Sequence, residues 1–152
     1  MSVRRFSLDS NLLVYVYDYR DPQKRAVAEQ LVVGAATREC MLALQAIGEF
    51  YTVVTRKNMV SRSEAAREAQ NFLALFAHFP ATADAHRIAA REAVAGRFSY
   101  WDAVLLASAS EAGCKILFSE DMRDGARLGD ITVRTPFAPK GLSAAASAAL
   151  AR

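Results

Sequence analysis

The apolar residues of this chain follow two alternating patterns. A continuous apolar run at 40–44 (CMLAL) is typical of a strand covered on both faces, and the run at 114–119 (CKILFS) predicts a second strand. Between such runs lie stripes with the three-to-four-residue spacing of amphipathic helices, for example Ile47, Phe50, Tyr51 and Val54. Strands that alternate with helices are typical of a parallel sheet covered on both faces, so the sequence predicts an α/β fold.

Capping residues and helix breakers mark where these elements begin and end. Asp21 with Pro22 begins a helix, SRSE at 61–64 forms a capping box, and Gly34 and Gly96 end helices. The expected strands cover 3–8, 40–44, 79–82, 114–119 and 131–137. The expected helices lie near 12–19, 22–34, 45–58, 61–76, 84–95 and 99–113, and a polar turn or short helix is expected at 119–130.

Length and composition fit one compact domain. A chain of 152 residues, 53% of them hydrophobic, can build a single core. We assign residues 1–138 to this domain and expect the alanine-rich tail, 139–152, to be a loosely held helix or a disordered end. No apolar run approaches the roughly 20 residues of a membrane span, and no secretory signal is evident at the N-terminus. We therefore expect no membrane partner and a cytoplasmic location.

Cysteine content and net charge change this picture little. Cys40 and Cys114 stand far apart without a histidine or second cysteine nearby, so we expect reduced core residues. A net charge of +3 and a pI near 9.1 suit a nucleic-acid partner, but the basic residues are scattered and indicate one only weakly.

The carboxylate of Asp102 lies at an unusual position in its predicted helix. Leu105, Leu106 and Ala109 follow it by three, four and seven residues, so Asp102 shares their apolar face. A buried carboxylate is costly unless it is hydrogen-bonded, paired with a cation or bound to a metal ion. Its surroundings must therefore supply one of these partners.

Three further acids are expected at the same edge of the sheet. Asp9 and Asp121 end predicted strands, and Glu49 lies in the first turns of the helix after the 40–44 strand. Ligands of open parallel sheets bind at the carboxyl ends of the strands. Crowded carboxylates either take up protons or are neutralised by divalent cations, and oxygen ligands of this kind suit Mg²⁺ or Mn²⁺.

Each acid also has a purely structural interpretation. Asp9 is a suitable helix cap, and SYWD at 99–102 matches a capping box that includes Asp102. Glu49 has polar neighbours on its helix, and Asp121 belongs to an acidic turn. Periodicity alone leaves both interpretations open.

Four motifs follow one another along the chain: DSN at 9–11, QAIGEFYTVVTRK at 45–57, SYWDAVLLASA at 99–109 and ILFSEDM at 116–122. Together they resemble the PIN-domain ribonucleases, in particular toxins of the VapC type. The resemblance extends to about Phe137. It implies a three-layer fold with a central parallel sheet of four to five strands.

The resemblance also implies metal-dependent hydrolysis of RNA that leaves a 5′-phosphate and a 3′-hydroxyl. The family's catalytic acids fall on Asp9, Glu49, Asp102 and Asp121, and of these Asp9, Asp102 and Asp121 would bind Mg²⁺ or Mn²⁺. Its supporting polar positions fall on Ser10, Asn11 and Ser119. Many relatives have a threonine-asparagine-aspartate triplet where this chain has SED, so Asp124 is an alternative to Asp121 as the last acid.

Toxins of this type form homodimers and are inhibited by a cognate antitoxin, so the resemblance implies both partners besides RNA. Basic residues that flank the motifs are candidates for contacts with RNA phosphates: Arg56, Lys57, Arg97 and Arg123. Two alternatives remain: a PIN-fold RNA-binding module without strong catalysis, and a housekeeping RNA-processing nuclease without an antitoxin.

Overall fold

The computed structural model describes residues 4–151, so the expected start of the first strand at Val3 lies outside the described residues. The strands are β1 (Phe6–Leu8), β2 (Met41–Ala43), β3 (Ala77–Phe79), β4 (Ile116–Phe118), β5 (Arg127–Leu128), β6 (Ile131–Arg134), β7 (Phe137–Ala138) and β8 (Gly141–Leu142). The helices are α1 (Ser10–Tyr15), α2 (Pro22–Ala35), α3 (Leu44–Arg56), α4 (Arg62–Leu75), α5 (Ala83–Ala95), α6 (Tyr100–Glu111) and α7 (Ala144–Leu150).

The central sheet has the strand order β1-β4-β6-β5, in which β1, β4 and β6 are parallel. A second parallel pair, β2-β3, lies beside β1 through a bridge between Phe6 and Cys40. The short strand β5 is antiparallel to β6 because only Gly129 and Asp130 separate the paired residues Leu128 and Ile131, too few for a crossover. The α/β prediction is confirmed, with one antiparallel edge strand that the sequence did not indicate.

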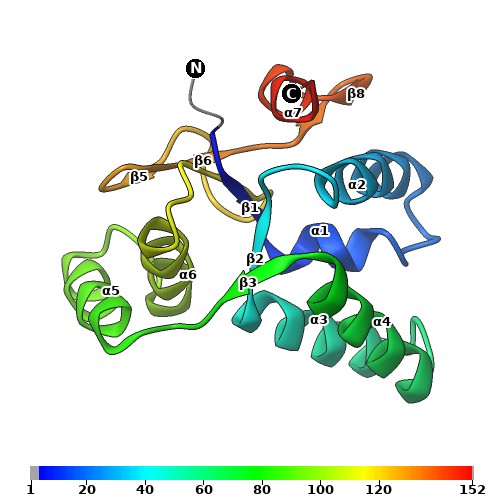
Figure 1. The fold of residues 1–152 in the computed structure, drawn as a ribbon, viewed down its shortest axis with the longest axis horizontal. Helices are drawn as coiled ribbons and strands as arrows, with labels where there is room; N and C mark the ends of the chain where they lie inside the picture. Colours follow the sequence, from blue (N-terminus) through cyan, green and yellow to red (C-terminus); the bar gives the residue numbers. More distant parts are fainter. Residues whose placement is uncertain (1–3, 152) are drawn as a thin grey trace.

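Helices cover both faces of the strands. In Figure 1, α1 to α4 lie on one side of β1 and β2, and α5 and α6 lie on the other. Phe6 and Phe118 pack against the first group, whereas their neighbours Leu117 and Val133 pack against the second. Because side chains alternate along a strand, β4 contributes to both core clusters and fixes the middle layer of a three-layer fold.

Several boundaries differ from those expected. The strand expected at 79–82 lies at Ala77–Phe79, where it pairs with β2, and Pro80 has no N–H with which to extend the ladder. The expected strand 131–137 is divided at Thr135 and Pro136 into β6 and β7. The stretch at 119–130 consists of turns and β5.

The end of the chain forms the β7–β8 hairpin, which spans the boundary expected at residue 138, and continues as α7. Ser143 caps this helix by accepting a hydrogen bond from the Ala146 N–H at 3.2 Å, and Ala146 is fully buried. The side chain of Leu150 lies over Gly34 of α2. How firmly the tail is held, and the division of the chain at residue 138, stay predictions. None of the helices between residues 4 and 151 is both long enough and apolar enough to cross a bilayer.

Candidate active site

Asp9 is fixed where β1 ends and α1 begins. Its N–H donates to the Phe118 carbonyl at 2.9 Å, which continues the pairing of β1 with β4. One carboxylate oxygen accepts from the Ser10 N–H at 2.7 Å, and the other accepts from the Ser119 hydroxyl at 2.7 Å. Asp9 thus caps α1, as one interpretation of the sequence predicted, and is also held toward the end of β4.

The carboxylate of Asp9 is buried, with a residue exposure of 6%. Burial raises its pKa from an ordinary value of 3.8 to about 6, although the hydrogen bonds from Ser119 and Ser10 oppose this shift. The negative charges of Asp121 and Glu49 raise the pKa further. Asp9 is therefore a buried acid whose hydrogen-bond donors are all neutral and whose charged neighbours are all negative.

Glu49 lies on α3 and belongs to the same group of charges. Partial burial raises its pKa, the negative charges of Asp102 and Asp121 add to the shift, and the Gln45 side chain opposes it. The negative charges of Glu49 and Asp121 raise the pKa of Asp9, and those of Asp102 and Asp121 raise the pKa of Glu49. The four predicted acids are therefore close enough to interact electrostatically. We call them the acid cluster.

Asp102 occupies the first turn of α6. The Ser99 hydroxyl accepts a hydrogen bond from the Asp102 N–H at 3.2 Å, so Ser99 caps the helix and leaves the Asp102 carboxylate free of that role. The apolar face inferred from the sequence is broader than expected, because every residue from 103 to 109 is buried. Its place in the first turn of α6, where its charge acts on Glu49, therefore locates Asp102 better than the apolar stripe does.

The three acids after β4 have different surroundings. Asp124 accepts hydrogen bonds from Arg134 Nε at 3.2 Å and from the Thr135 N–H at 2.9 Å. Asp121 donates its N–H to the Ser119 hydroxyl at 3.2 Å, and its carboxylate has no ion pair within the described residues. Of these three acids, only Asp121 contributes to the raised pKa values of Asp9 and Glu49. The geometry thus favours Asp121 over Asp124 as the fourth acid.

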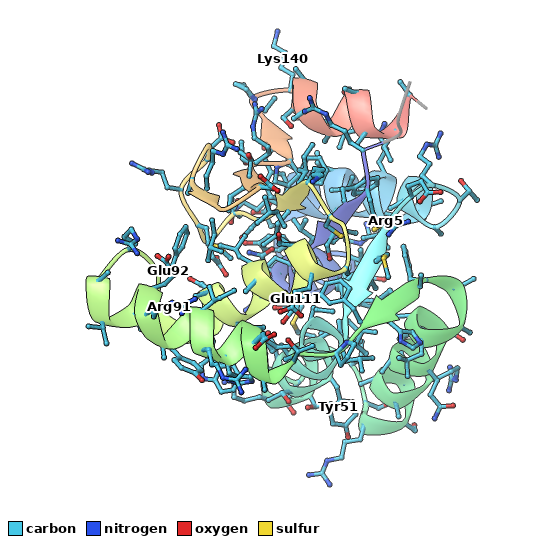
Figure 2. All side chains as sticks on the ribbon, turned by 60° about the vertical axis from the view of Figure 1, so that its left-hand side comes forward. Arg5, Tyr51, Arg91, Glu92, Glu111 and Lys140 are labelled. Atoms are coloured by element: carbon cyan, nitrogen blue, oxygen red, sulfur yellow. The ribbon has the colours of Figure 1, made fainter. Side chains whose placement is uncertain are left out.

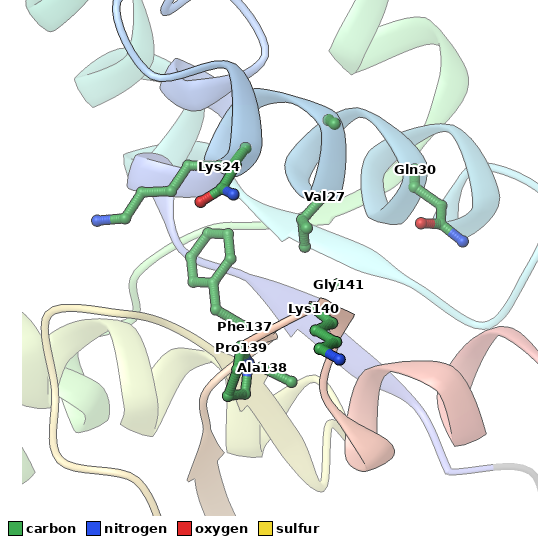
Figure 3. A pocket seen from close by; sticks show the side chains of 10 residues that line it. Lys24, Val27, Gln30, Phe137, Ala138, Pro139, Lys140 and Gly141 are labelled. Carbon is green, nitrogen blue, oxygen red and sulfur yellow. The ribbon is translucent and has the colours of Figure 1, made fainter.

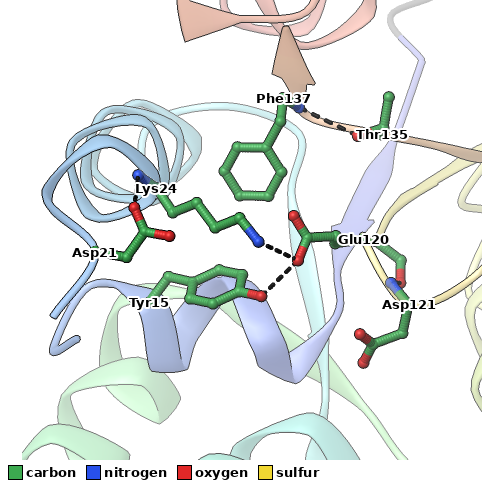
Figure 4. A network of polar contacts seen from close by, with 8 residues as sticks. Tyr15, Asp21, Lys24, Glu120, Asp121, Thr135 and Phe137 are labelled. Atoms are coloured by element: carbon green, nitrogen blue, oxygen red, sulfur yellow. Dashed lines mark hydrogen bonds and ion pairs between the residues drawn. The ribbon is translucent and has the colours of Figure 1, made fainter. Parts of the chain in front are cut away.

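The side chain of Glu120 points away from the acid cluster and contacts Tyr15 and Lys24, which the sequence did not indicate. One of its oxygens accepts from Lys24 Nζ at 2.7 Å and from the Tyr15 hydroxyl at 2.6 Å (Figure 4). The Lys24 ammonium lies 5.1 Å from the centre of the Tyr15 ring and 5.8 Å from that of Phe137. This Tyr15–Lys24–Glu120 contact anchors the segment after β4 to α1 and α2.

The chemistry of the acid cluster fits a divalent cation. Between residues 4 and 151, no three Asp, Glu, His or Cys side chains form a ready-made metal cage. Mg²⁺ needs no such cage, because it keeps several waters and takes only one or two carboxylates directly. The side-chain amide of Asn11, two residues after Asp9, is buried with neither its oxygen nor its nitrogen paired. An uncompensated acid and an unpaired amide together suit a hydrated cation.

A pocket of about 470 Å³ adjoins Asp102, and we call it the arginine pocket. It is lined by Arg97, Phe98, Ser99, Asp102, Met122, Arg123, Ala126 and Arg127. Arg97 pairs with Glu92 of α5, labelled in Figure 2, at 2.6 Å. Two of the four predicted RNA contacts thus border the acid cluster, and Arg127 joins them. The other two, Arg56 and Lys57, lie at the far end of α3.

A pocket larger than the arginine pocket lies elsewhere and contains none of the predicted acids. It has a volume of about 620 Å³ and lies between α2 and the β7–β8 hairpin, where Val27 and Phe137 face each other (Figure 3). Volume alone therefore does not identify the functional site in this molecule.

Known proteins resemble this chain in sequence family and in fold. Residues 7–128 match the family model described as PIN domain. The structure resembles VapC20 of Mycobacterium tuberculosis, described as a sarcin-ricin loop cleaving toxin, with a TM-score of 0.62 and 20% identity over 76% of this chain and 91% of that one. None of the curated proteins matches the chain significantly.

Two solved complexes also resemble the chain. A toxin–antitoxin complex from Klebsiella pneumoniae has a TM-score of 0.61 and 19% identity, over 86% of this chain and 97% of that one. DNA-bound VapBC from Salmonella typhimurium has a TM-score of 0.60 and 14% identity, over 87% of this chain and 98% of that one. At such identities the likeness to these structures concerns the fold alone. The family model, by contrast, covers most of the chain. The chain therefore belongs to the PIN-domain family.

Proposed function

We propose that this protein is a metal-dependent endoribonuclease and the toxin of a toxin–antitoxin pair. The observation that carries the proposal is Asp9, a buried acid at the carboxyl end of β1 with a raised pKa, neutral hydrogen-bond donors and only negative charges beside it. The raised pKa indicates that these hydrogen bonds do not offset the cost of burying the charge, so a bound cation would stabilise this group. PIN-domain nucleases typically use divalent metals, which agrees with this chemistry.

The four acids divide between two tasks in the proposed reaction. Asp9, Asp102 and Asp121 would hold Mg²⁺ or Mn²⁺, with Ser10 and Ser119 fixing the orientation of Asp9. When bound, such an ion lowers the pKa of a water and offsets charge on the scissile phosphate. Glu49, whose pKa is raised, would complete the shell of the ion or orient the attacking water.

The arginine pocket would receive the RNA backbone. Arg123 and Arg127 have no ion pair within the described residues, and both line the pocket that Asp102 also lines. Arg97 would supply a third positive charge, reduced by its pairing with Glu92. A phosphate bound here would place the neighbouring phosphodiester beside the acid cluster. Arg56 and Lys57 would contact a more distant part of the RNA.

The partners and location follow from the same proposal. Solved relatives of this fold include a toxin–antitoxin complex and a DNA-bound VapBC complex, so we extend an antitoxin partner to this chain. We also propose that the protein forms a homodimer. Its proposed location is the cytoplasm, where it would encounter both RNA and the antitoxin. Retention of all four acids favours catalysis over the alternative of an RNA-binding module.

RNA cleavage tests the proposal directly. Purified protein should cleave RNA with Mg²⁺ or Mn²⁺ and lose this activity in EDTA, and both D9N and D102N should be inactive. The matched control is D130N, because Asp130 is an exposed aspartate outside the acid cluster. Equal cleavage by the wild type and D9N would overturn the nuclease proposal.

Growth separates the toxin from a housekeeping nuclease. Expression of the chain alone should arrest growth, and D9N should not. Co-expression of a protein encoded beside it should restore growth. Cleavage in vitro without arrest would retain the nuclease and refute the toxin.

A further inference from the structure

Three rings gather at the start of α6, next to the acid cluster. They belong to His86 of α5 and to Tyr100 and Trp101 of α6, and we call them the ring cluster. The centre of the Trp101 ring lies 5.5 Å from that of Tyr100 and 6.0 Å from that of His86. Trp101 is 60% exposed and Tyr100 is 36% exposed. The largest apolar side chain of the protein thus stays in solvent although two aromatic neighbours touch it.

The ring cluster is held in place by polar contacts. His86 Nδ1 and the Tyr100 hydroxyl are hydrogen-bonded at 2.6 Å. Gln45 Nε2 of α3 donates to the Trp101 carbonyl at 3.4 Å. The planes of Tyr100 and His86 stand at 80° and 85° to the indole, so neither ring stacks in parallel on Trp101. A positioned indole with no parallel partner is suited to receive another flat ring.

The position of the ring cluster connects it to the proposed reaction. Trp101 immediately precedes Asp102, and Gln45, which contacts it, lies one helical turn before Glu49. The arginine pocket begins in the same first turn of α6, at Ser99 and Asp102. A single strand that crosses this turn would therefore meet arginines, carboxylates and rings in close succession.

We propose that the ring cluster is a stacking platform for one unpaired base of the RNA, next to the cleaved phosphodiester. The inference rests on the proposed nuclease function and assigns to the site a second binding element beside the arginine pocket. A flat π-face with cations nearby fits a nucleobase attached to phosphates, since the rings take the base and the arginines take the backbone. Stacking reads no sequence, so the platform selects an unpaired nucleotide of any identity.

The fluorescence of the protein offers a direct probe, because Trp101 is its single tryptophan. Wild-type protein in EDTA is titrated with an unstructured 12-nucleotide RNA, and stacking should quench the Trp101 emission to saturation. Binding of labelled RNA by W101A should weaken about 5- to 150-fold, the equivalent of about 1–3 kcal/mol for one stacked base. W101F should recover most of the lost affinity, because it restores a flat ring.

Two comparisons isolate the stacked base. Y19A is the matched control, because Tyr19 is an exposed aromatic residue in the segment between α1 and α2 and should leave RNA affinity unchanged. RNAs with one abasic nucleotide at each position in turn should reveal one position that weakens wild-type binding. The same abasic position should have no effect on W101A, because the stacking partner is already missing.

The outcomes separate this inference from the nuclease proposal. If the wild type cleaves RNA but its Trp101 emission is unchanged at saturation, or if W101A binds RNA as the wild type does, the platform is refuted and the nuclease stands. Quenching without cleavage supports the platform and refutes the nuclease. Emission that depends on protein concentration without RNA assigns the rings to a contact between copies and overturns the platform.

Discussion

Replacement of Asp9 by asparagine should make the metal-free protein more stable at neutral and alkaline pH. Asp9 is buried, and its pKa is raised from 3.8 to about 6 in the folded state. Between these two values the folded protein binds more protons than the unfolded chain, so stability falls as pH rises through the window. Below pH 4 Asp9 is mostly protonated and its burial costs little stability. Above pH 6 it is ionised, and the full cost of burying its charge lowers the stability.

The size of the effect follows from the shift. A pKa raised by about two units costs about 3 kcal/mol of stability above pH 6, at about 1.4 kcal/mol per unit. Asparagine keeps one acceptor for Ser10 but presents an NH₂ group toward Ser119, which loses about 1 kcal/mol of hydrogen bonding. We therefore expect D9N to be more stable than the wild type by about 1–2 kcal/mol at pH 8, and slightly less stable at pH 4.

Urea unfolding followed by far-ultraviolet circular dichroism at pH 4 and pH 8, in EDTA, measures the effect. The difference in unfolding free energy between D9N and wild type should change sign between the two pH values, whereas D130N should follow the wild type at both. Mg²⁺ at pH 8 should stabilise the wild type and not D9N, because only the wild type gains binding energy from the ion. A D9N protein that is destabilised equally at pH 4 and pH 8 refutes the reasoning.

Three further outcomes test particular contacts. D121N should reduce RNA cleavage by at least about a hundredfold, whereas D124N should retain cleavage and lower the midpoint of urea unfolding, because Asp124 holds Arg134 and Thr135. E120Q should reduce cleavage about tenfold at low Mg²⁺ with recovery at high Mg²⁺, since it weakens the contact with Lys24 that positions Asp121; unchanged Mg²⁺ dependence would exclude this role. L150A should expose the tail to limited proteolysis and leave cleavage unchanged, and resistance equal to that of the wild type would contradict tail packing on α2.

The order of the elements in the sequence is enough to predict that the acids lie at one edge of the sheet. Asp9 ends a strand and Asp102 opens a helix, and the topology of a parallel sheet places such ends at one edge. The argument from the apolar face of α6 was weaker, because the helix is buried on nearly all sides and a stripe there does not define a direction. The structure adds an argument for Asp121 over Asp124 that the sequence lacks, since the Arg134 side chain that pairs with Asp124 comes from β6.

Contacts between distant segments could not be predicted from the sequence. Tyr15 and Lys24 meet Glu120 over separations of 105 and 96 residues, and no local pattern connects them. Arg127 was missed as a candidate because it lies outside the recognised motifs, and only the fold brings it beside Arg123 and Asp102. The ring cluster was missed because Trp101 reads as an ordinary apolar helix residue until its exposure is known.

Basic side chains near this region pair with acids outside the acid cluster. Lys24 pairs with Glu120 and Arg134 pairs with Asp124, whereas Asp9 is held by the hydroxyl of Ser119 and the N–H of Ser10. Neutral donors fix the position of a carboxylate without cancelling its charge, so the geometry survives while the negative potential remains.

The same Ser119 hydroxyl accepts the Asp121 N–H, so one small residue at the end of β4 joins two acids of the cluster. A lysine or arginine at that position would satisfy Asp9 more strongly and stabilise the fold, but it would also occupy the place of a bound cation. Under the proposed function, the stability lost at Asp9 would be the physical counterpart of an affinity of the acid cluster for a metal ion.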